Sequence, residues 1–266
     1  MGTPGEGATG RRSGRQSAPI VALATYGIAL LAWVAVVTRW LPMPGAGNGG
    51  TGMSAPGGPE AMALSNGLSG VGLYLVMWTV MMVAMMYPSS VPLFRMYYRT
   101  LDGTTRVGTA TRVGAFMGTY ALVWALTGVV PLVVNAVFPV ATVAREQSGL
   151  LVGGALFLLA VYQLSPYKNR CLKHCRTPLG FLIEYHQPGV RGAARMSARF
   201  STYCIGCCWA LFALLVVVGS MNVLWMGAIT LVLSVERLFE WGEWLAKGVG
   251  VVSAVAGAVL VVASML

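Results

Sequence analysis

The sequence predicts an all-α protein, a polytopic transmembrane helical bundle of six or seven spans. The chain is 56% hydrophobic and only 10% charged, and its mean hydropathy is +0.71. A soluble domain carries about a quarter charged residues, so too few polar side chains remain to cover a water-facing surface. The apolar residues also fall in stretches near the roughly 20 residues that a bilayer crossing needs. A lipid bilayer is therefore the first expected partner.

Seven apolar stretches follow one another along the chain. The fifth and sixth are separated only by residues 220–222, which predicts a tight helical hairpin. The fourth and sixth stretches are short, so the expected count is six or seven. The stretches cover about 20–38, 70–90, 114–134, 149–166, 203–219, 223–238 and 248–266.

The basic residues predict the orientation, because Lys and Arg gather in cytoplasmic connections. With seven spans and a cytoplasmic N-terminus, only Arg39 and Arg145 of the 18 Lys and Arg residues fall outside. The sequence therefore predicts a multi-pass protein of the plasma membrane. The net charge of +10 lies between the spans and forms no basic face with interleaved aromatics, which argues against nucleic acid as a partner.

The segments outside the spans have distinct compositions. Residues 1–18 are basic and rich in Gly and Ser, which predicts disorder, and 19–266 are expected to form a single transmembrane domain. The first apolar run is long for a signal peptide, so a retained helix is favoured. We expect a flexible external loop at 41–69 and a basic cytoplasmic loop at 167–202. Gly114 and Gly118 have the spacing that allows close helix approach, but ordinary packing is a sufficient interpretation.

The five cysteines form two groups with matched spacing. Cys171, His174 and Cys175 follow the fourth stretch, and Cys204, Cys207 and Cys208 open the fifth. Both triplets occupy positions i, i+3 and i+4, which places three side chains on one face of a helix. Five thiols and one imidazole are therefore expected at the same level of the membrane.

The predicted cytoplasmic location gives these thiols a chemical interpretation. Thiols are normally reduced there, so a cluster more often binds a metal or carries out redox chemistry than forms structural disulfides. Thiolates favour soft metals, and Cu(I) or Zn(II) is the metal that we expect the cluster to bind. Thiol redox chemistry and simple packing remain open alternatives. His174 is a weaker ligand candidate, since the cysteines alone supply four donors.

A methionine-rich face precedes the cysteines in the second stretch. Met77, Met81, Met82, Met85 and Met86 fall on one half of the helix. Thioethers are soft donors, so a Cu(I) path is one interpretation, but methionine also fills gaps between helices, and packing is favoured. Pro88 is expected to terminate or kink this helix.

The last cytoplasmic connection carries Glu236, Glu240 and Glu243 at i, i+4 and i+7. Pairing with loop arginines is the favoured interpretation. Glu236 lies closest to the membrane, so it is also a candidate accessory ligand or proton relay. No phosphate-binding loop, serine triad or paired catalytic acids occur, and a non-enzymatic role is preferred.

Three runs of residues resemble a known family. They are Trp78…Met81-Met82-Val83-Ala84-Met85-Met86-Tyr87-Pro88; Tyr162-Gln163…Pro166…Lys168…Cys171…Cys175-Arg176-Thr177-Pro178; and Cys204-Ile205-Gly206-Cys207-Cys208-Trp209-Ala210-Leu211, continuing to Gly219-Ser220-Met221-Asn222…Trp225-Met226 and Glu236. Between about residues 70 and 240 the chain resembles the bacterial and archaeal family of predicted metal-binding integral membrane proteins, a domain of unknown function. Phe212 stands where that family has methionine and Arg237 where it has lysine.

The resemblance implies metal binding and agrees with the cysteine pattern. The leading hypothesis is a membrane protein that binds Cu or Zn through the cysteine cluster and serves metal handling or the assembly of a partner metalloprotein. One alternative is a membrane thiol oxidoreductase that uses Cys207 with Cys204 or Cys208. A second alternative is a Cu(I) transporter in which the methionine face and the thiols are successive stops, with Met81, Met82, Met85 and Met86 as accessory ligands.

Overall fold

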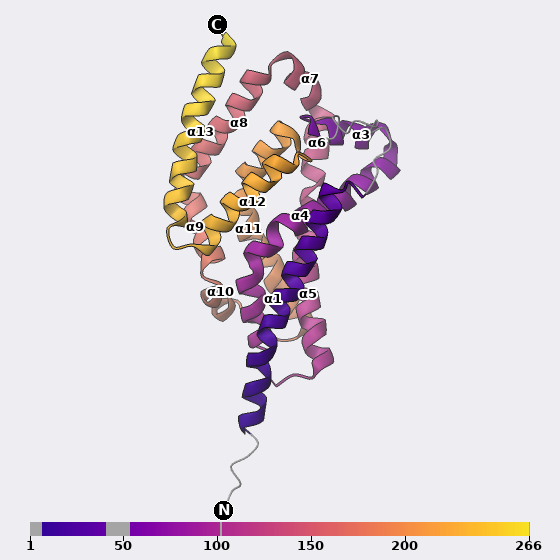
Figure 1. Ribbon diagram of the computed structural model, residues 1–266, viewed down its shortest axis with the longest axis vertical. Helices are drawn as coiled ribbons and strands as arrows, with labels where there is room; N and C mark the ends of the chain where they lie inside the picture. Colours follow the sequence, from indigo (N-terminus) through magenta and orange to yellow (C-terminus); the bar gives the residue numbers. More distant parts are fainter. Residues whose placement is uncertain (1–6, 41–53, 102, 266) are drawn as a thin grey trace, which may run out of the picture.

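The computed structural model describes residues 7–40, 54–101 and 103–265, and within them every regular element is a helix. The helices form an elongated bundle, with the start of α1 at one end and the end of α13 at the other (Figure 1). The helices are α1 (Gly7–Val37), α3 (Gly58–Ser65), α4 (Gly67–Arg99), α5 (Arg106–Thr127), α6 (Val129–Val137), α7 (Val140–Glu146), α8 (Ser148–Gln163), α9 (Pro166–Arg176), α10 (Pro178–Glu184), α11 (Gly189–Gly219), α12 (Val223–Leu238) and α13 (Gly242–Met265).

Five helical segments are long and apolar enough to cross a membrane: residues 19–37, 67–99, 106–137, 189–219 and 242–265. The third of these joins α5 and α6. The pair α7 and α8, bent by 114°, raises the number to six if it counts as one span. Helix α12, the sixth expected span, is 16 residues long. The helical class is confirmed, and the count of six or seven stays a prediction.

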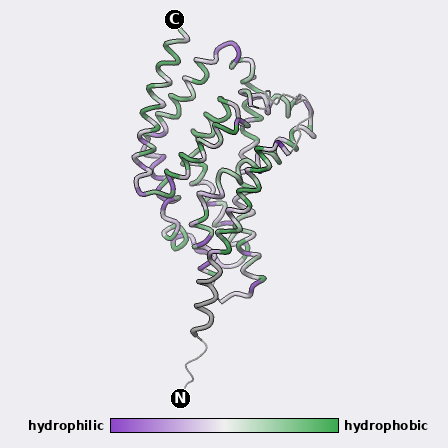
Figure 2. The backbone as a smooth tube through the Cα atoms, viewed as in Figure 1, coloured by the Kyte–Doolittle hydropathy of each residue, from purple (hydrophilic) through white to green (hydrophobic). Residues whose placement is uncertain are grey.

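The outer helices present apolar side chains to their surroundings. On α1, Leu23 and Leu31 are 71% and 70% exposed, and on α13 Val252 and Val259 are 68% and 61% exposed. Figure 2 shows hydrophobic residues along most of α13 and along the part of α1 from residue 19 on. Single exposed apolar residues are normal on a soluble protein, but whole helical faces of this kind mark a surface covered by another apolar phase or partner.

Helices α4, α5 and α11 form the centre of the bundle, and their buried aromatic rings pack against one another. The ring of Phe94 on α4 lies 6.0 Å from Phe116 and 5.8 Å from Tyr120, both on α5, and Tyr120 lies 6.0 Å from Phe200 on α11. Helix α1 covers α4, α13 pairs with α8, and α9 packs against α11. The last contact brings the two cysteine-bearing helices together.

The hairpin predicted at 220–222 is confirmed, since α11 ends at Gly219 and α12 begins at Val223. Gly219 has φ +115°, and a Cβ there would lie 2.3 Å from the carbonyl oxygen of Ser54, so the turn requires glycine. Asn222 caps α12 by accepting from the backbone N–H groups of Leu224 and Trp225 at 3.1 and 3.4 Å.

One local expectation is wrong in part. Helix α4 does not end at Pro88 but continues through Pro88 and Pro92 to Arg99. A Cβ added to Gly114 or Gly118 would meet no neighbouring helix within 4 Å among the described residues. The close approach occurs instead between α8 and α13, where a Cβ on Gly153 would lie 3.0 Å from the carbonyl oxygen of Gly257.

Two segments expected to lie outside the spans, the basic N-terminus and the external loop, fall partly outside the described residues. Residues 1–6 of the basic N-terminal segment and residues 41–53 of the external loop are not described. Of the rest, α1 includes residues from Gly7 on, and α3 occupies part of 54–69. Glu60 on α3 is buried and accepts from the hydroxyl of Tyr74 at 2.9 Å, which fastens α3 to α4. The division of the chain into domain and loops stays a prediction.

Candidate metal centre

The candidate site forms where α9 crosses α11. Helix α9 begins at Pro166, and Ser165 caps it by accepting from the backbone N–H of Lys168 at 3.4 Å. Cys171 and Cys175, four residues apart on α9, therefore face the same side. On α11, Cys204, Cys207 and Cys208 share the face that packs against α9 and are at most 1% exposed. The packing of α9 on α11 thus brings the two cysteine groups together, and metal binding by them stays a prediction.

The thiols of α11 also bond to their own helix. Sγ of Cys207 donates to the carbonyl oxygen of Cys204 at 3.1 Å, and Sγ of Cys208 donates to the same oxygen at 2.7 Å. Across the helix interface, Sγ of Cys175 lies 3.8 Å from Sγ of Cys207. This is the contact that joins the two cysteine groups.

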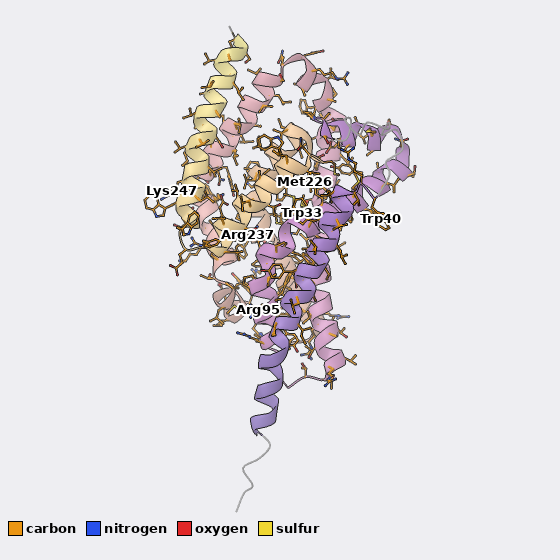
Figure 3. The ribbon with its side chains drawn as sticks, viewed as in Figure 1. Trp33, Trp40, Arg95, Met226, Arg237 and Lys247 are labelled. Carbon is orange, nitrogen blue, oxygen red and sulfur yellow. The ribbon has the colours of Figure 1, made fainter. Side chains whose placement is uncertain are left out.

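A buried guanidinium lies among the sulfur atoms. Nη2 of Arg237, on α12, lies 2.9 Å from Sγ of Cys204, 3.2 Å from Cys207 and 3.6 Å from Cys208. Its Nη1 donates to Oγ of Ser89 at 3.1 Å and lies 3.8 Å from Sδ of Met86. Figure 3 shows Arg237 within the bundle, in contrast to Lys247 on the outer side of α13.

Arg237 has no carboxylate partner among the described residues, although it is only 5% exposed. A buried charge without an opposite charge is costly, so the surrounding sulfur atoms must supply the compensation. We name the group formed by Arg237 with Cys175, Cys204, Cys207 and Cys208 the thiol–arginine cluster.

Two hydrogen-bonded hydroxyl groups, of Ser90 and Tyr120, reach the thiol of Cys204 through Tyr120. The hydroxyl of Tyr120, on α5, lies 2.8 Å from Sγ of Cys204 and accepts from Oγ of Ser90 at 3.0 Å. Tyr120 is fully buried in the aromatic core. Cys204 is therefore held by α5 and α12 as well as by its own helix.

The other two predicted ligands lie at the edge of the cluster. Cys171 is partly exposed and packs against Gly206, where an added Cβ would lie 2.8 Å from its Sγ. His174 stacks on Tyr203 with ring centroids 4.2 Å apart and an interplanar angle of 1°, and its Nδ1 lies 3.0 Å from the carbonyl oxygen of Arg170. Neither contacts Arg237.

Glu236 takes part in a second buried network beside the cluster. Its carboxylate accepts from Nζ of Lys168, on α9, at 2.8 and 2.9 Å, and both side chains are 1% exposed. Gln163, at the end of α8, bonds to both residues. This network ties α8, α9 and α12 together, so it fixes α9 relative to Arg237.

The other acidic residues of this connection also meet basic partners. Glu243 lies 3.3 Å from the guanidinium of Arg176, which also donates to the carbonyl oxygens of Phe239 and Glu240, at 2.8 and 2.5 Å. The expected pairing with a loop arginine is therefore confirmed for Glu243. The chain leaves the helix between Leu238 and Gly242, so the three glutamates do not share one helical face.

The methionine face of α4 is buried. Met81, Met82, Met85 and Met86 are at most 1% exposed, whereas Val76 on the other half is 50% exposed. This burial agrees with the favoured packing role. Met86 is the member that reaches the thiol–arginine cluster, through Nη1 of Arg237.

The environment of α9 disfavours thiolates on this helix. Hydrogen bonds to Cys204 and Cys207, together with burial, raise the pKa of Cys175 well above that of a free thiol. Burial and the nearby Cys207 raise the pKa of Cys171. A metal that binds Cys175 must therefore displace a proton.

The donor set fits a soft cation, but the side chains do not form a finished coordination sphere. Within the described residues, no three Cys, His, Asp or Glu side chains are placed as a metal site requires. A guanidinium lies between the thiols of Cys204, Cys207 and Cys208, so a bound cation has to shift it or share the sulfur atoms with it. The chemistry of the site is soft-donor binding next to a fixed positive charge.

Comparison with known protein families agrees with this chemistry. Residues 75–260 match the family model PpoB2, described as copper chaperone. The chain belongs to the PpoB2 copper chaperone family. The match begins within α4 and ends within α13, so it contains all five cysteines and Arg237 and leaves out α1. No curated protein and no solved structure matches the chain. Membership in a copper family supports the metal-related part of the sequence resemblance.

Sequence reasoning missed the residues that organise the cluster. Arg237 stands out in the sequence only as a departure from lysine, Lys168 and Gln163 only as parts of a motif, and Tyr120 and Ser89 not at all. The sequence held one signal for Arg237: it stands next to Glu236, and two adjacent ionisable residues at the end of an apolar stretch are candidates for a functional site.

Proposed function

We propose that this PpoB2 family member is an integral membrane copper chaperone that binds Cu(I) as cargo through the thiol–arginine cluster and delivers it to a metalloprotein. The apolar outer faces of α1 and α13 and the five long apolar helices support the membrane location. The distribution of basic residues supports a cytoplasmic N-terminus and a cytoplasmic location of the cysteines.

The observation that carries the proposal is the convergence of three thiols of α11 on one guanidinium, with a fourth thiol, Cys175 of α9, in contact with Cys207. Cu(I) is bound well by two or three thiolates, whereas a structural Zn(II) site takes four ligands in a tetrahedron. Arg237 Nη2 occupies the position from which three sulfur atoms are reached at 2.9 to 3.6 Å. A monovalent cation can replace or accompany this charge with a smaller change in the buried electrostatics than a divalent one.

The same arrangement supports release of the cargo. Cys171 and Cys175 lie on the short helix α9 at the edge of the cluster and are more exposed than the cysteines of α11. An incoming thiolate or thioether of a partner protein reaches this edge first. Transfer then proceeds by exchange of sulfur ligands, and Arg237 compensates the thiolates of α11 once the copper has left.

Copper titration of the detergent-purified chain under anaerobic, reducing conditions tests the proposal. Competition with a chromogenic Cu(I) chelator measures the affinity, and elemental analysis gives the stoichiometry. We expect tight Cu(I) binding by the wild-type chain and its loss in the Cys204→Ser/Cys207→Ser/Cys208→Ser variant. The matched control is Ser253→Ala on α13, which leaves every sulfur in place. Equal tight binding by the triple variant and the wild type would reject the cluster as the site.

One contact favours a second candidate function, thiol redox chemistry. The 3.8 Å separation between Sγ of Cys175 and Sγ of Cys207 links cysteines on different helices, unlike the pairs expected from the sequence. Diamide oxidises such a pair by taking two electrons and two protons, which leaves one disulfide and the reduced hydrazine. A redox enzyme requires this disulfide to be turned over by a thiol donor. Failure to trap Cys175 with Cys207 by mass mapping would remove this candidate.

A further inference from the structure

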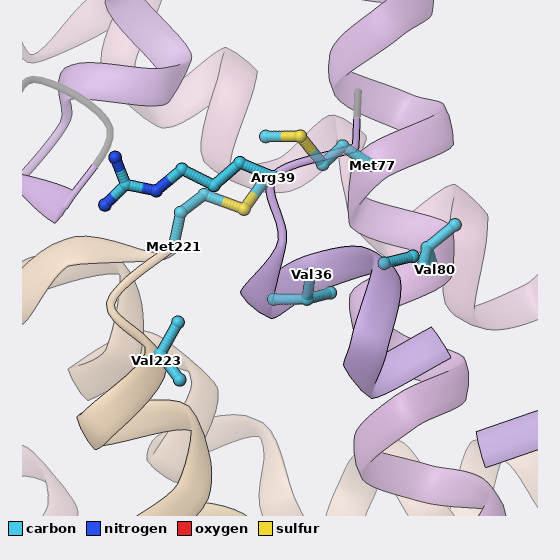
Figure 4. Close-up of a pocket in the computed structure, with 7 residues that line it drawn as sticks. Val36, Arg39, Met77, Val80, Met221 and Val223 are labelled. Atoms are coloured by element: carbon cyan, nitrogen blue, oxygen red, sulfur yellow. The ribbon is translucent and has the colours of Figure 1, made fainter. Parts of the chain in front are cut away.

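A small pocket lies away from the cysteines, between α1, α4 and the turn that joins α11 to α12. Its cavity is about 30 Å³, which is enough space for a water molecule or a small ion. The walls are formed by Val36, Val80 and Val223, by the side chain of Arg39, and by two methionines, Met77 and Met221. Figure 4 shows these side chains around the pocket.

The two methionines come from separate elements and both extend into this space. Met77 lies on α4 and Met221 in the turn between α11 and α12, and they are 9% and 7% exposed. In Figure 4 the guanidinium of Arg39 points away from the two sulfur atoms. The residues that line the pocket include no Asp, Glu, Cys or His. The side-chain donors in the pocket are therefore two neutral thioethers, beside apolar side chains and Arg39.

The pocket is far from the thiol–arginine cluster along the helices. At 1.5 Å per residue, Met77 lies about 14 Å along α4 from Met86, the methionine that contacts Arg237. Gly219, just before the turn that carries Met221, lies about 22 Å along α11 from Cys204. Between the two places the methionines of α4 remain buried in the core.

We propose that Met77 and Met221 form a second, thioether-only site for Cu(I) beside the turn between α11 and α12, away from the cysteines. Thioethers are soft and uncharged, so they select a soft monovalent cation and do not offset the desolvation of a divalent one. Uncharged donors hold copper more weakly than thiolates do, which suits a site that takes up or releases cargo. The identity of the bound ion, Cu(I), rests on the proposed function, but the sulfur donors of this site are separate from the cysteines.

Cu(I) titration of the full chain in detergent tests this site, with Cu(I) in a weakly competing chelator as the probe. We expect the wild type to bind two Cu(I) ions of different affinity and the Met77→Leu/Met221→Leu variant to bind one, with the tight phase unchanged. Leucine conserves volume and removes only the sulfur. The matched control is Met265→Leu, a methionine that is 74% exposed at the end of α13.

A second measurement separates this site from the cysteine cluster. In a chain with all five cysteines changed to serine, we expect one weakly bound Cu(I), with sulfur scatterers in its X-ray absorption spectrum and at least a tenfold loss of affinity on adding Met77→Leu/Met221→Leu. A weak phase that is unchanged by the two leucines, or a wild-type chain that binds a single Cu(I), would overturn the second site. Loss of the tight phase alone bears on the proposed function, so the two failures are distinguishable.

Discussion

Nη2 of Arg237 lies 2.9 Å from Sγ of Cys204, and the same nitrogen also reaches Cys207 and Cys208. A guanidinium at this distance makes charge-assisted hydrogen bonds to a thiolate. It occupies the place of a cation among three sulfur atoms and has no carboxylate partner among the described residues. The positive charge that organises the cluster is therefore part of the chain itself.

Replacing Arg237 with leucine is expected to weaken Cu(I) binding at least tenfold. Copper bound by two thiolates carries a net negative charge, and in a buried site the guanidinium compensates it. Arg237→Lys keeps the charge but not the forked donors, so its Cu(I) affinity should lie between those of the wild type and Arg237→Leu. Competition titration measures the Cu(I) affinity of the wild type and of both variants, and Arg145→Leu, at an exposed position, is the control. Wild-type affinity in Arg237→Leu would show that this charge plays no part in binding.

The Lys168–Glu236 pair is expected to position α9 rather than to bind copper. Lys168→Met leaves a buried carboxylate without its cation and should cost about 3–5 kcal/mol of unfolding free energy. The double variant Lys168→Met/Glu236→Gln removes both charges and should recover part of this loss. Thermal unfolding in detergent measures both. The control is Glu243→Gln, which removes the charge of a 49% exposed partner of Arg176, and its cost should stay below about 1 kcal/mol.

Cys175 is expected to react slowly with alkylating reagents at pH 8. Its raised pKa keeps the thiol protonated, and only the thiolate is nucleophilic. Because the folded chain holds this proton more tightly than the unfolded chain does, the corresponding stabilisation is present below about pH 8.5 and is lost as the pH rises through the folded-state pKa.

Iodoacetamide labelling followed by peptide mass analysis measures this reactivity between pH 7 and 10. The variant Cys204→Ala/Cys207→Ala removes the two hydrogen-bond partners and should speed the labelling of Cys175 at pH 8. If Cys175 in the wild type labels as fast as a free peptide thiol, the explanation by hydrogen bonding and burial is wrong.

His174 and Cys175 are expected to behave differently although they are adjacent. His174 is stacked on Tyr203 and does not contact Arg237, whereas Cys175 contacts Cys207. His174→Ala should change the Cu(I) affinity less than about threefold, and Cys175→Ser at least tenfold, where tenfold corresponds to about 1.4 kcal/mol. Equal losses in the two variants would make His174 a ligand and contradict the placement of its ring.

Pattern alone predicted much of the helical arrangement. The apolar stretches near 70–90, 203–219 and 248–266 correspond to α4, α11 and α13, because a long apolar run has few ways other than a helix to satisfy its backbone when it is buried. Helix ends were harder to predict. Pro88 lies inside α4, where tertiary packing outweighs the loss of one backbone hydrogen bond.

The sequence by itself determined the helical class, the methionine-rich face and the placement of each cysteine group on one face of its helix, because these follow from residue spacing. Only the tertiary structure decided which groups meet across helices. Arg237, Tyr120 and Met86 are far from the cysteines in sequence and reach them through the packing of α12, α5 and α4 around α11. His174 has the spacing of a ligand, but stacking on Tyr203 turns its ring to the edge of the cluster. A helical spacing fixes the face of a side chain, whereas its partners depend on how neighbouring helices pack against that face.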